Sequence, residues 1–396
     1  MLIIFSGLIL RALLAIYNIS YGVLPGAGSD GLSFHLEAVR FMDWLNLKYP
    51  DNTYILTEWL SGYADDIGVT HGDRYATRTV ELKLYSVGWI YSAFLGHLYN
   101  IFGVSHIATS LLSCFVWFLS AITLRGILLR CKIDNSKINL ALLFYCFLFP
   151  TSVIYTSVTL REVYILFFIN FVVLLFFILK DQKNYFFIFL NLIIISLFLF
   201  MLGYLHRSNI VFIALFLASV ASYFIIKKLI TYCKNKKFHH LNKLIIIMCV
   251  AMIFIFDYSG YMQKIFSSIQ SYQTGHFHEI TIFRASYFTI EEVASREYSI
   301  FNFFYYSFKN LLYYFIQPSI FQISNLKDFV LAFENIMRLI MVFYSVNKIY
   351  RYPNNNTLLH ILFMFFIFSE IPYSQATINW GTASRHHLQV LGILIV

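Results

Sequence analysis

Long apolar runs separated by short polar turns fill most of this chain of 396 residues. The runs are too long for barrel strands and show no period of two, so they predict helices that cross a membrane. Together they predict an all-α protein, a polytopic bundle of about ten transmembrane helices that forms one integral membrane domain, residues 1–396. The main spans are expected at residues 2–19, 107–124, 138–158, 163–179, 185–204, 209–226, 244–256, 329–346 and 358–371.

Two long polar segments interrupt this pattern, at residues 20–83 and 257–328. The first carries nine of the twenty acids. Apolar residues spaced by four and three positions predict an amphipathic helix within it: Phe34, Ala38, Phe41 and Leu45. In the second segment, residues 305–317 are rich in aromatic side chains and are expected to lie along the membrane surface.

Positive charge in the turns sets the expected orientation. The loop from Lys227 to Lys243 contains lysines and no acid, which predicts that it is cytoplasmic, as is the N-terminus. Both long polar segments then face the periplasm. If the apolar run at residues 84–104 also crossed the membrane, the basic stretch at 125–137 would face outward, so we expect this run to lie on or dip into the membrane.

The composition agrees with a membrane protein, with 12% charged residues against about 25% in soluble domains. The net charge of +9 lies in short turns, so no nucleic-acid partner is expected. The five cysteines show neither metal-ligand nor disulfide spacing. Because a phosphate-binding loop, a GxSxG elbow and an HExxH motif are all missing, ATPase, serine-hydrolase and zinc-protease functions lack support, and no cofactor is expected.

One acid, Asp30, lies where the first membrane helix ends and the amphipathic helix begins. Two interpretations are open. Asp30 or Ser29 could cap the helix through its side-chain oxygen, or Asp30 could be a catalytic carboxylate that takes a proton from a hydroxyl at the membrane boundary. His35 lies off the apolar face of the same helix and is a candidate substrate contact.

Further polar residues gather at the outer helix ends in this topology. Arginine forks bind phosphate oxygens at two points, so an acid beside arginines predicts a lipid-phosphate substrate and an acceptor hydroxyl that arrives from outside. Each arginine alone could equally be a solvated helix end or a headgroup contact. Arg11 differs because it lies near the middle of the first span, where a charge usually faces a cavity or a partner. The candidate substrate-binding residues are Arg11, His35, Arg161, Glu162, His206, Arg207, Arg385 and His386.

The histidines give only weak signals for a metal. His276, His278 and Glu279 could form a ligand cluster on an extended loop, although ordinary polar loop residues explain them more simply. The adjacent His386 and His387 cannot both face one point on a helix. We therefore predict no metal site.

Four stretches, taken together, resemble a known superfamily: Arg11 in an apolar start followed by a loop with Asp30; Tyr99…Phe102-Gly103; Pro150-Thr151-Ser152…Leu160-Arg161-Glu162; and Asn379-Trp380-Gly381-Thr382…Arg385-His386. They resemble the C-type multispanning glycosyltransferases, which use polyprenyl-phosphate-linked sugars. The last two stretches are similar to bacterial O-antigen and capsule repeat-unit polymerases. The resemblance implies that Asp30 is the catalytic base, although many members have two adjacent acids here, and in this chain Gly31 follows Asp30.

The expected function is transfer of a sugar or oligosaccharide from an undecaprenyl-(di)phosphate-linked donor to a saccharide acceptor, at the periplasmic face of a bacterial inner membrane. The donor lipid would be embedded in the bilayer. Its leaving phosphate would be held by three arginines, Arg161, Arg207 and Arg385. A transporter or flippase of lipid-linked saccharides is the alternative, favoured by charges inside spans: Arg11, Glu334 and Arg338. Glu334 and Arg338 are four residues apart on one expected helix, so they are expected to pair. An acyltransferase would need a histidine-based centre, for which His35 is the early candidate.

Overall fold

The computed structural model describes most of the chain as two compact units. Unit 1 is Met1–Ile213 with Ile395–Val396, unit 2 is Ala214–Leu394, and each is considered by itself. The lysine-rich loop Lys227–Lys243 and the spans expected at residues 209–226 and 244–256 lie outside the described residues. These described residues are 1–22, 24, 30–48, 63–69, 80–83, 89–131, 133–181, 183–205, 258, 260–280, 290–351, 357–377 and 380–396.

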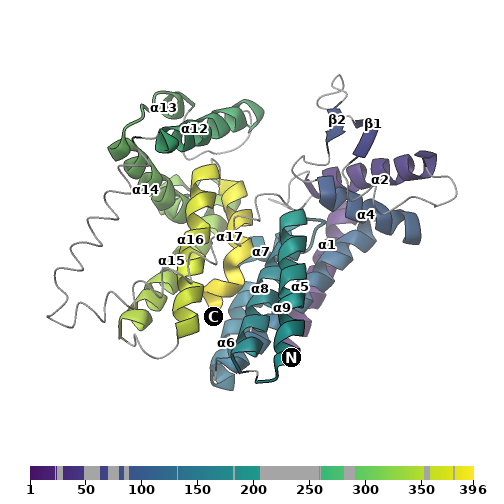
Figure 1. Ribbon diagram of the computed structural model, residues 1–396, viewed down its shortest axis with the longest axis horizontal. Helices are drawn as coiled ribbons and strands as arrows, with labels where there is room; N and C mark the ends of the chain where they lie inside the picture. The colour runs from purple at the N-terminus through teal and green to yellow at the C-terminus, as the bar shows by residue number, and fades with distance from the viewer. Residues whose placement is uncertain are drawn as a thin grey trace. The chain divides into compact units, whose positions relative to one another are not determined.

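Unit 1 is built around one central helix, α5 (His106–Arg130), which is capped at its start by the Ser105 hydroxyl. Two helices pack against α5, namely α1 (Leu2–Tyr21) and α8 (Glu162–Asp181). A fourth helix, α9 (Tyr185–Leu205), packs on α8, and Figure 1 shows α5, α8 and α9 together. The core between α5 and α8 combines apolar side chains with buried polar ones, and Asn170 Nδ2 on α8 donates to Ser120 Oγ on α5 at 2.8 Å.

Beside this bundle, α2 (Asp30–Lys48) lies along α4 (Trp89–Phe102). With 14 residues, α4 is shorter than the roughly 20 residues that a membrane span needs. A short antiparallel hairpin, β1 (Tyr63–Val69) and β2 (Val80–Lys83), adds strands that the all-α prediction did not include. The chain is otherwise helical in the part that the structure describes.

Among the described residues, four helices are long and apolar enough to cross a membrane. They are α1, α5, residues Glu162–Leu179 of α8, and residues Leu326–Ile349 of α15 (Leu326–Arg351). This confirms a mainly helical protein with four candidate membrane-spanning helices among the described residues. The full set of about ten helices and the periplasmic position of the long polar segments stay predictions.

The single continuous span predicted at residues 138–158 is wrong. α6 (Asn135–Leu143) runs into one π-helical turn, Phe144–Leu148, and α7 (Pro150–Tyr155) ends after six residues. Pro150 explains the break because it has no N–H for the carbonyl four residues earlier and its ring obstructs a continuing helix. Residues 156–161 then run as turns to α8, and they are mostly buried, as irregular backbone in a membrane protein must be.

Unit 2 follows a similar helical plan. Besides α15 it contains α12 (Tyr261–Ile280), α13 (Ile290–Ala294), α14 (Ile300–Ile316), a 3₁₀ turn (Ile320–Gln322), α16 (Thr357–Ala376) and α17 (Trp380–Ile395). The polar segment expected at residues 257–328 is therefore largely helical where it is described. In α15, Glu334 and Arg338 form the predicted ion pair at 2.8 Å, and both side chains are almost fully buried.

The segment between the expected spans that holds Arg385 and His386 has the polar composition of an outer turn, but residues 380–387 form the start of α17. Ala383, His387 and Leu391 are buried at a spacing of four residues, which is the spacing of one helix face. Because most residues in this stretch are charged or polar, the apolar pattern of a helix was not recognisable in the sequence. Arg385 and His386 therefore lie on a helix rather than in a loop.

Gly96 lets α4 approach α2 closely. A Cβ at Gly96 would lie 2.8 Å from the Ala38 carbonyl oxygen and 2.5 Å from Phe41 Cδ1. Ala38, Phe41 and Leu45 are buried, which confirms the apolar face predicted for α2. This contact fixes the position of α2, and therefore of Asp30, at which α2 begins.

We predict that Gly96→Ala lowers the free energy of unfolding by about 1–3 kcal/mol, because the new methyl group meets backbone that cannot move aside. The measurement is the thermal unfolding midpoint of the purified protein in detergent. Gly126→Ala is the matched control, since its Cβ would lie 3.3 Å from Leu174 Cδ1, the end of a flexible side chain. Equal midpoints for the two variants would contradict the close approach.

Candidate functional site

The first turn of α2 lies directly against the irregular segment between α7 and α8. A Cβ added to Gly31 would stand 3.4 Å from the carbonyl oxygen of Thr159 and 3.6 Å from its nitrogen. Asp30 precedes Gly31, and Arg161 follows Thr159 by two residues. Two stretches that are far apart in sequence therefore meet here, and we name residues 30–35 together with 159–162 the α2–α8 junction.

Asp30 is the first residue of α2, and its side chain lies outside the described part of the chain. This helix start places Asp30 at the first helical position. A carboxylate at that position is favoured by the helix dipole. Because helix ends shift by a residue or two, the cap and the catalytic base both stay predictions for Asp30.

Arg161 and Glu162 occupy the other side of the junction, at the start of α8. The guanidinium carbon of Arg161 lies 5.7 Å from the ring centre of Phe34 on α2, which is within cation–π range. Arg161 is half-buried, whereas Glu162 is only 3% exposed in the first turn of α8. Because the dipole of α8 favours a carboxylate there, Glu162 fits a structural role, whereas phosphate binding by Arg161 stays a prediction.

His35 belongs to the same junction through its contacts with α4 and α5. Its Nδ1 lies 2.7 Å from the Tyr99 hydroxyl, and its ring stacks on that of His106 with centres 4.6 Å apart. Burial lowers the pKa of His35 below its usual value, so the ring is neutral at neutral pH. With Nδ1 bound to Tyr99, Nε2 is the ring atom that could meet a substrate.

A chain of hydroxyl groups continues from Tyr99 to the junction. The Tyr99 hydroxyl lies 3.2 Å from Thr109 Oγ1, which lies 3.1 Å from Thr159 Oγ1. Ser110 Oγ is 3.0 Å from the same Thr159 oxygen. These side chains are buried, so the hydrogen bonds link α4 and α5 to the segment before α8 and fix the backbone against which α2 begins.

Arg11, expected as a substrate contact, is fully enclosed by protein. Its side chain is 0% exposed, with the guanidinium carbon 3.4 Å from the ring centre of Trp117 on α5. Its Nε donates to Thr156 Oγ1 at 2.7 Å, and its Nη1 donates to the carbonyls of Gly7 at 3.2 Å and Cys146 at 3.0 Å. Since no side is open to a ligand, we assign Arg11 a structural role.

The break at Pro150 explains why this cation is needed. In a continuous helix, the Cys146 carbonyl would accept a hydrogen bond from the N–H of residue 150, which proline lacks. Arg11 donates to that carbonyl instead. The sequence signal for this pairing, an arginine in one span and a proline in another, was visible, but their proximity was not.

The remaining predicted residues lie in unit 2 or outside the described residues. His206 and Arg207 lie outside the described residues. Arg385 and His386 lie on α17 in unit 2, where His386 Nδ1 is 2.8 Å from Thr377 Oγ1 and its ring stacks on Tyr373. Arg385 is half-buried.

The sequence analysis missed a buried pair in unit 2, His387 and Glu370. The Nδ1 atom of His387 lies 3.1 Å from both Glu370 carboxylate oxygens, and its Nε2 lies 3.3 Å from the Tyr314 carbonyl. Both side chains are at most 3% exposed. Because both ring nitrogens face polar protein atoms, the pair fastens α17 to α16 and α14. An acid inside the apolar run at residues 358–371 was the signal that could have found it.

His386 and His387 face different partners, as the adjacent positions predicted. In the part of the chain that is described, no group of three or more histidine, cysteine or acidic side chains is close enough to hold a metal ion. The side chains of His276, His278 and Glu279 lie outside that part.

Comparisons with family models, with curated proteins and with solved structures each find no match for this chain.

We predict that Arg11→Lys lowers the free energy of unfolding by about 1.5–3 kcal/mol, because an ammonium group cannot serve Thr156, the two carbonyls and the Trp117 ring together. The measurement is the thermal unfolding midpoint in detergent. Arg130→Lys, at the exposed end of α5, is the matched control and should leave the midpoint unchanged. An unaltered midpoint for Arg11→Lys would contradict the structural role.

Proposed function

We propose that the protein is a membrane glycosyltransferase that moves a sugar or oligosaccharide from an undecaprenyl-(di)phosphate-linked donor to a saccharide acceptor. The reaction would take place at the periplasmic face of a bacterial inner membrane during surface-polysaccharide assembly, with repeat-unit polymerisation as one form of it. A bundle of about ten helices, with the two long polar segments outside, would carry this site.

One observation carries the proposal: the first turn of α2 lies against Thr159, with a Gly31 Cβ only 3.4 Å from the Thr159 carbonyl. This contact puts the backbone of Asp30 near the segment that ends in Arg161. An acid and an arginine fork at the same junction are the two groups that glycosyl transfer from a lipid phosphate requires. Two helix starts, those of α2 and α8, add positive dipole ends that favour a phosphate.

In the proposed reaction, the acceptor hydroxyl oxygen forms a bond to the anomeric carbon of the donor sugar. The bond from that carbon to the phosphate oxygen breaks, and the lipid (di)phosphate leaves with the bonding electrons. Asp30 takes the proton of the hydroxyl, and Arg161 balances the charge on the leaving phosphate. His35, whose Nδ1 is bound to Tyr99, would contact the sugar through Nε2.

A transporter or flippase of lipid-linked saccharides is the second candidate, because charged side chains are buried in helices that could cross the membrane. These charges already have partners: Arg11 bonds to Thr156, and Glu334 bonds to Arg338 at 2.8 Å. Transport through them would require these contacts to rearrange. The two candidates differ in outcome, since a transferase makes a new glycosidic bond and a flippase returns its substrate unchanged.

We predict that Asp30→Asn leaves expression and thermal stability close to the natural protein but lowers transfer by roughly 10²–10⁴-fold, because an amide cannot accept the proton. Asp30→Glu should keep a trace of activity, since its carboxylate is displaced. The assay is product formation on a lipid-linked donor, with membrane levels measured in parallel. An active Asp30→Asn protein together with an unstable Asp30→Ala protein would make the residue a helix cap.

For Arg161, the expected order of activity is natural protein, Lys, then Ala. Arg161→Lys keeps the charge but loses the two-point fork, so transfer should fall by about tenfold, and Arg161→Ala should lower it further. Thermal midpoints should stay near that of the natural protein in both variants. Arg130→Lys serves again as the control. Unaltered transfer in both Arg161 variants would show that this side chain does not hold the leaving phosphate.

A further inference from the structure

The helix α14 exposes an apolar stripe along its whole length. The stripe repeats at spacings of three and four residues, and each of its side chains is at least 40% exposed: Phe301, Phe304, Tyr305, Phe308, Leu312 and Ile316. We name these residues the α14 stripe. Because a continuous apolar surface of this kind is unfavourable in water, it indicates contact with a partner or with a membrane.

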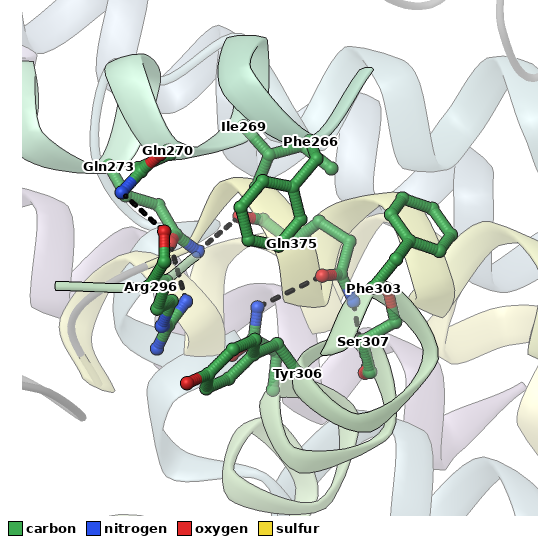
Figure 2. Close-up of a pocket in the computed structure, with 10 residues that line it drawn as sticks. Phe266, Ile269, Gln270, Gln273, Arg296, Phe303, Tyr306, Ser307 and Gln375 are labelled. Atoms are coloured by element: carbon green, nitrogen blue, oxygen red, sulfur yellow. Dashed lines mark hydrogen bonds between the residues drawn. The ribbon is translucent and has the colours of Figure 1, made fainter. Parts of the chain in front are cut away.

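The opposite face of α14 is already covered by protein (Figure 2). Asn310 Nδ2 donates to Gln375 Oε1 on α16 at 2.9 Å, and the Ser307 carbonyl accepts from Gln375 Nε2 at 3.1 Å. The guanidinium carbon of Arg296 lies 4.6 Å from the ring centre of Tyr306. These contacts fix the rotation of α14 about its axis, so the α14 stripe faces out of unit 2.

The next helix, α15, carries a similar stripe. Its members follow one another by three and four residues along the helix: Leu326, Phe329, Phe333, Ile336, Ile340 and Phe343. We name them the α15 stripe. Residues Leu326–Ile349 are long and apolar enough to cross a membrane, and the charged Glu334 and Arg338 lie on the other, buried face. The α15 stripe is therefore the surface of a candidate span that would face acyl chains.

A short polar elbow, residues 317–325, joins the two helices. Asn335 Nδ2 on α15 donates to the Gln317 carbonyl at 2.7 Å, which fastens the end of α14 to α15. Asn325 Oδ1 accepts from the N–H of Asp328 at 3.0 Å and so caps the start of α15. Irregular backbone with polar side chains belongs at the water boundary of a bilayer rather than in contact with its hydrocarbon core.

The length and the tyrosines of α14 favour a position along the membrane surface over a crossing. Its 17 residues extend about 25 Å, less than the roughly 30 Å of the hydrocarbon core. Its tyrosines lie at positions 305–306 and 313–314, and these pairs are only about 12 Å apart along the axis. The two aromatic belts of a span are separated by the whole hydrocarbon core. A crossing would therefore bury at least one of these pairs in hydrocarbon.

The side chains of the two stripes favour lipid over a second copy of this chain. Helices that pack together within a membrane bring their backbones close through small residues such as glycine, alanine and serine. Both stripes consist of phenylalanine, tyrosine, leucine and isoleucine alone. Tyr305 also suits the headgroup boundary, where its ring contacts acyl chains while its hydroxyl stays hydrated.

We propose that α14 lies half-immersed in one interface of the bilayer that α15 crosses, with the α14 stripe in contact with phospholipid. The elbow lies at the same depth and inserts the Phe321 side chain, which is 98% exposed. Amphipathic helices of this kind bury their apolar face about 5–10 Å into the boundary between headgroups and acyl chains. Because α14 is hydrogen-bonded to α16, this contact also sets the depth of α16. The proposal does not depend on the proposed function, since it applies equally to a transferase and to a flippase.

The test measures depth in the full-length protein reconstituted in phosphatidylcholine vesicles. A fluorescent coumarin amino acid replaces Phe301, Phe308 or Ile316, one at a time, to sample the start, middle and end of the α14 stripe. Nitroxide-labelled phosphatidylcholine quenches the fluorescence, with the nitroxide at the fifth acyl carbon for a shallow position or at the twelfth for a deep one. We expect the shallow label to quench all three positions about twofold more strongly than the deep label.

Two further positions are matched controls. Ile336 lies about 15 Å along α15 from Leu326, near the middle of a bilayer, so the deep label should quench more strongly there. Phe303 lies on the covered face of α14, and both labels should quench more weakly there than at Phe308. Unfolding midpoints confirm that each variant is folded. Phe304 and Leu312 are the substitute positions on the α14 stripe if one of the three replacements prevents folding.

Three results would overturn the proposal. Stronger quenching by the deep label at Phe308, with shallow quenching at Phe301 and Ile316, would mean that α14 crosses the membrane. If neither label quenched any of the three positions, protein or water would cover the α14 stripe. Photocrosslinking from p-benzoyl-phenylalanine at Phe308 should give lipid adducts, and a crosslinked dimer of the chain in their place would identify a second copy as the partner.

Discussion

The burial of one guanidinium group, that of Arg11, is the constraint on which the arrangement of unit 1 depends. A charge near the middle of a span is costly unless protein groups replace its water. Thr156 and the carbonyls of Gly7 and Cys146 supply the acceptors, and the face of Trp117 covers the group. Pro150 has no N–H to donate to the Cys146 carbonyl, and Arg11 donates to this carbonyl instead. The same hydrogen bond gives the buried Arg11 one of the acceptors that it needs.

This interaction positions the candidate site one turn farther along the chain. Thr156, held by Arg11, lies three residues before Thr159, which the Thr109 and Ser110 hydroxyls fix from α5. The first turn of α2 rests on Thr159, and α4 packs farther along the same face of α2, where the bare backbone of Gly96 approaches Ala38. Buried hydrogen bonds therefore connect Arg11, deep in the helix bundle, with the backbone segment that leads to Arg161. Hydrogen bonds and close packing beneath the site thus connect it to the buried Arg11.

Local signals in the sequence were reliable, and long-range pairings were not. The period of apolar residues identified the buried face of α2, and a spacing of four residues identified the Glu334–Arg338 pair, because both features belong to single helices. The break in the span at residues 138–158 was missed, since Pro150 shows where a helix is weakened but not which partner makes the break tolerable. The pairing of His387 with Glu370 joins two helices, and a single sequence carries no information on that proximity.

The measurement that tests the central claim most directly is the fate of a defined lipid-linked oligosaccharide incubated with the purified protein and an acceptor. If the α2–α8 junction performs glycosyl transfer, mass spectrometry should find the acceptor heavier by the transferred saccharide, with an equimolar amount of free polyprenyl (di)phosphate. If the oligosaccharide stays attached to its lipid and changes only the face of the vesicle membrane on which it lies, the protein is a flippase and the transferase account is wrong.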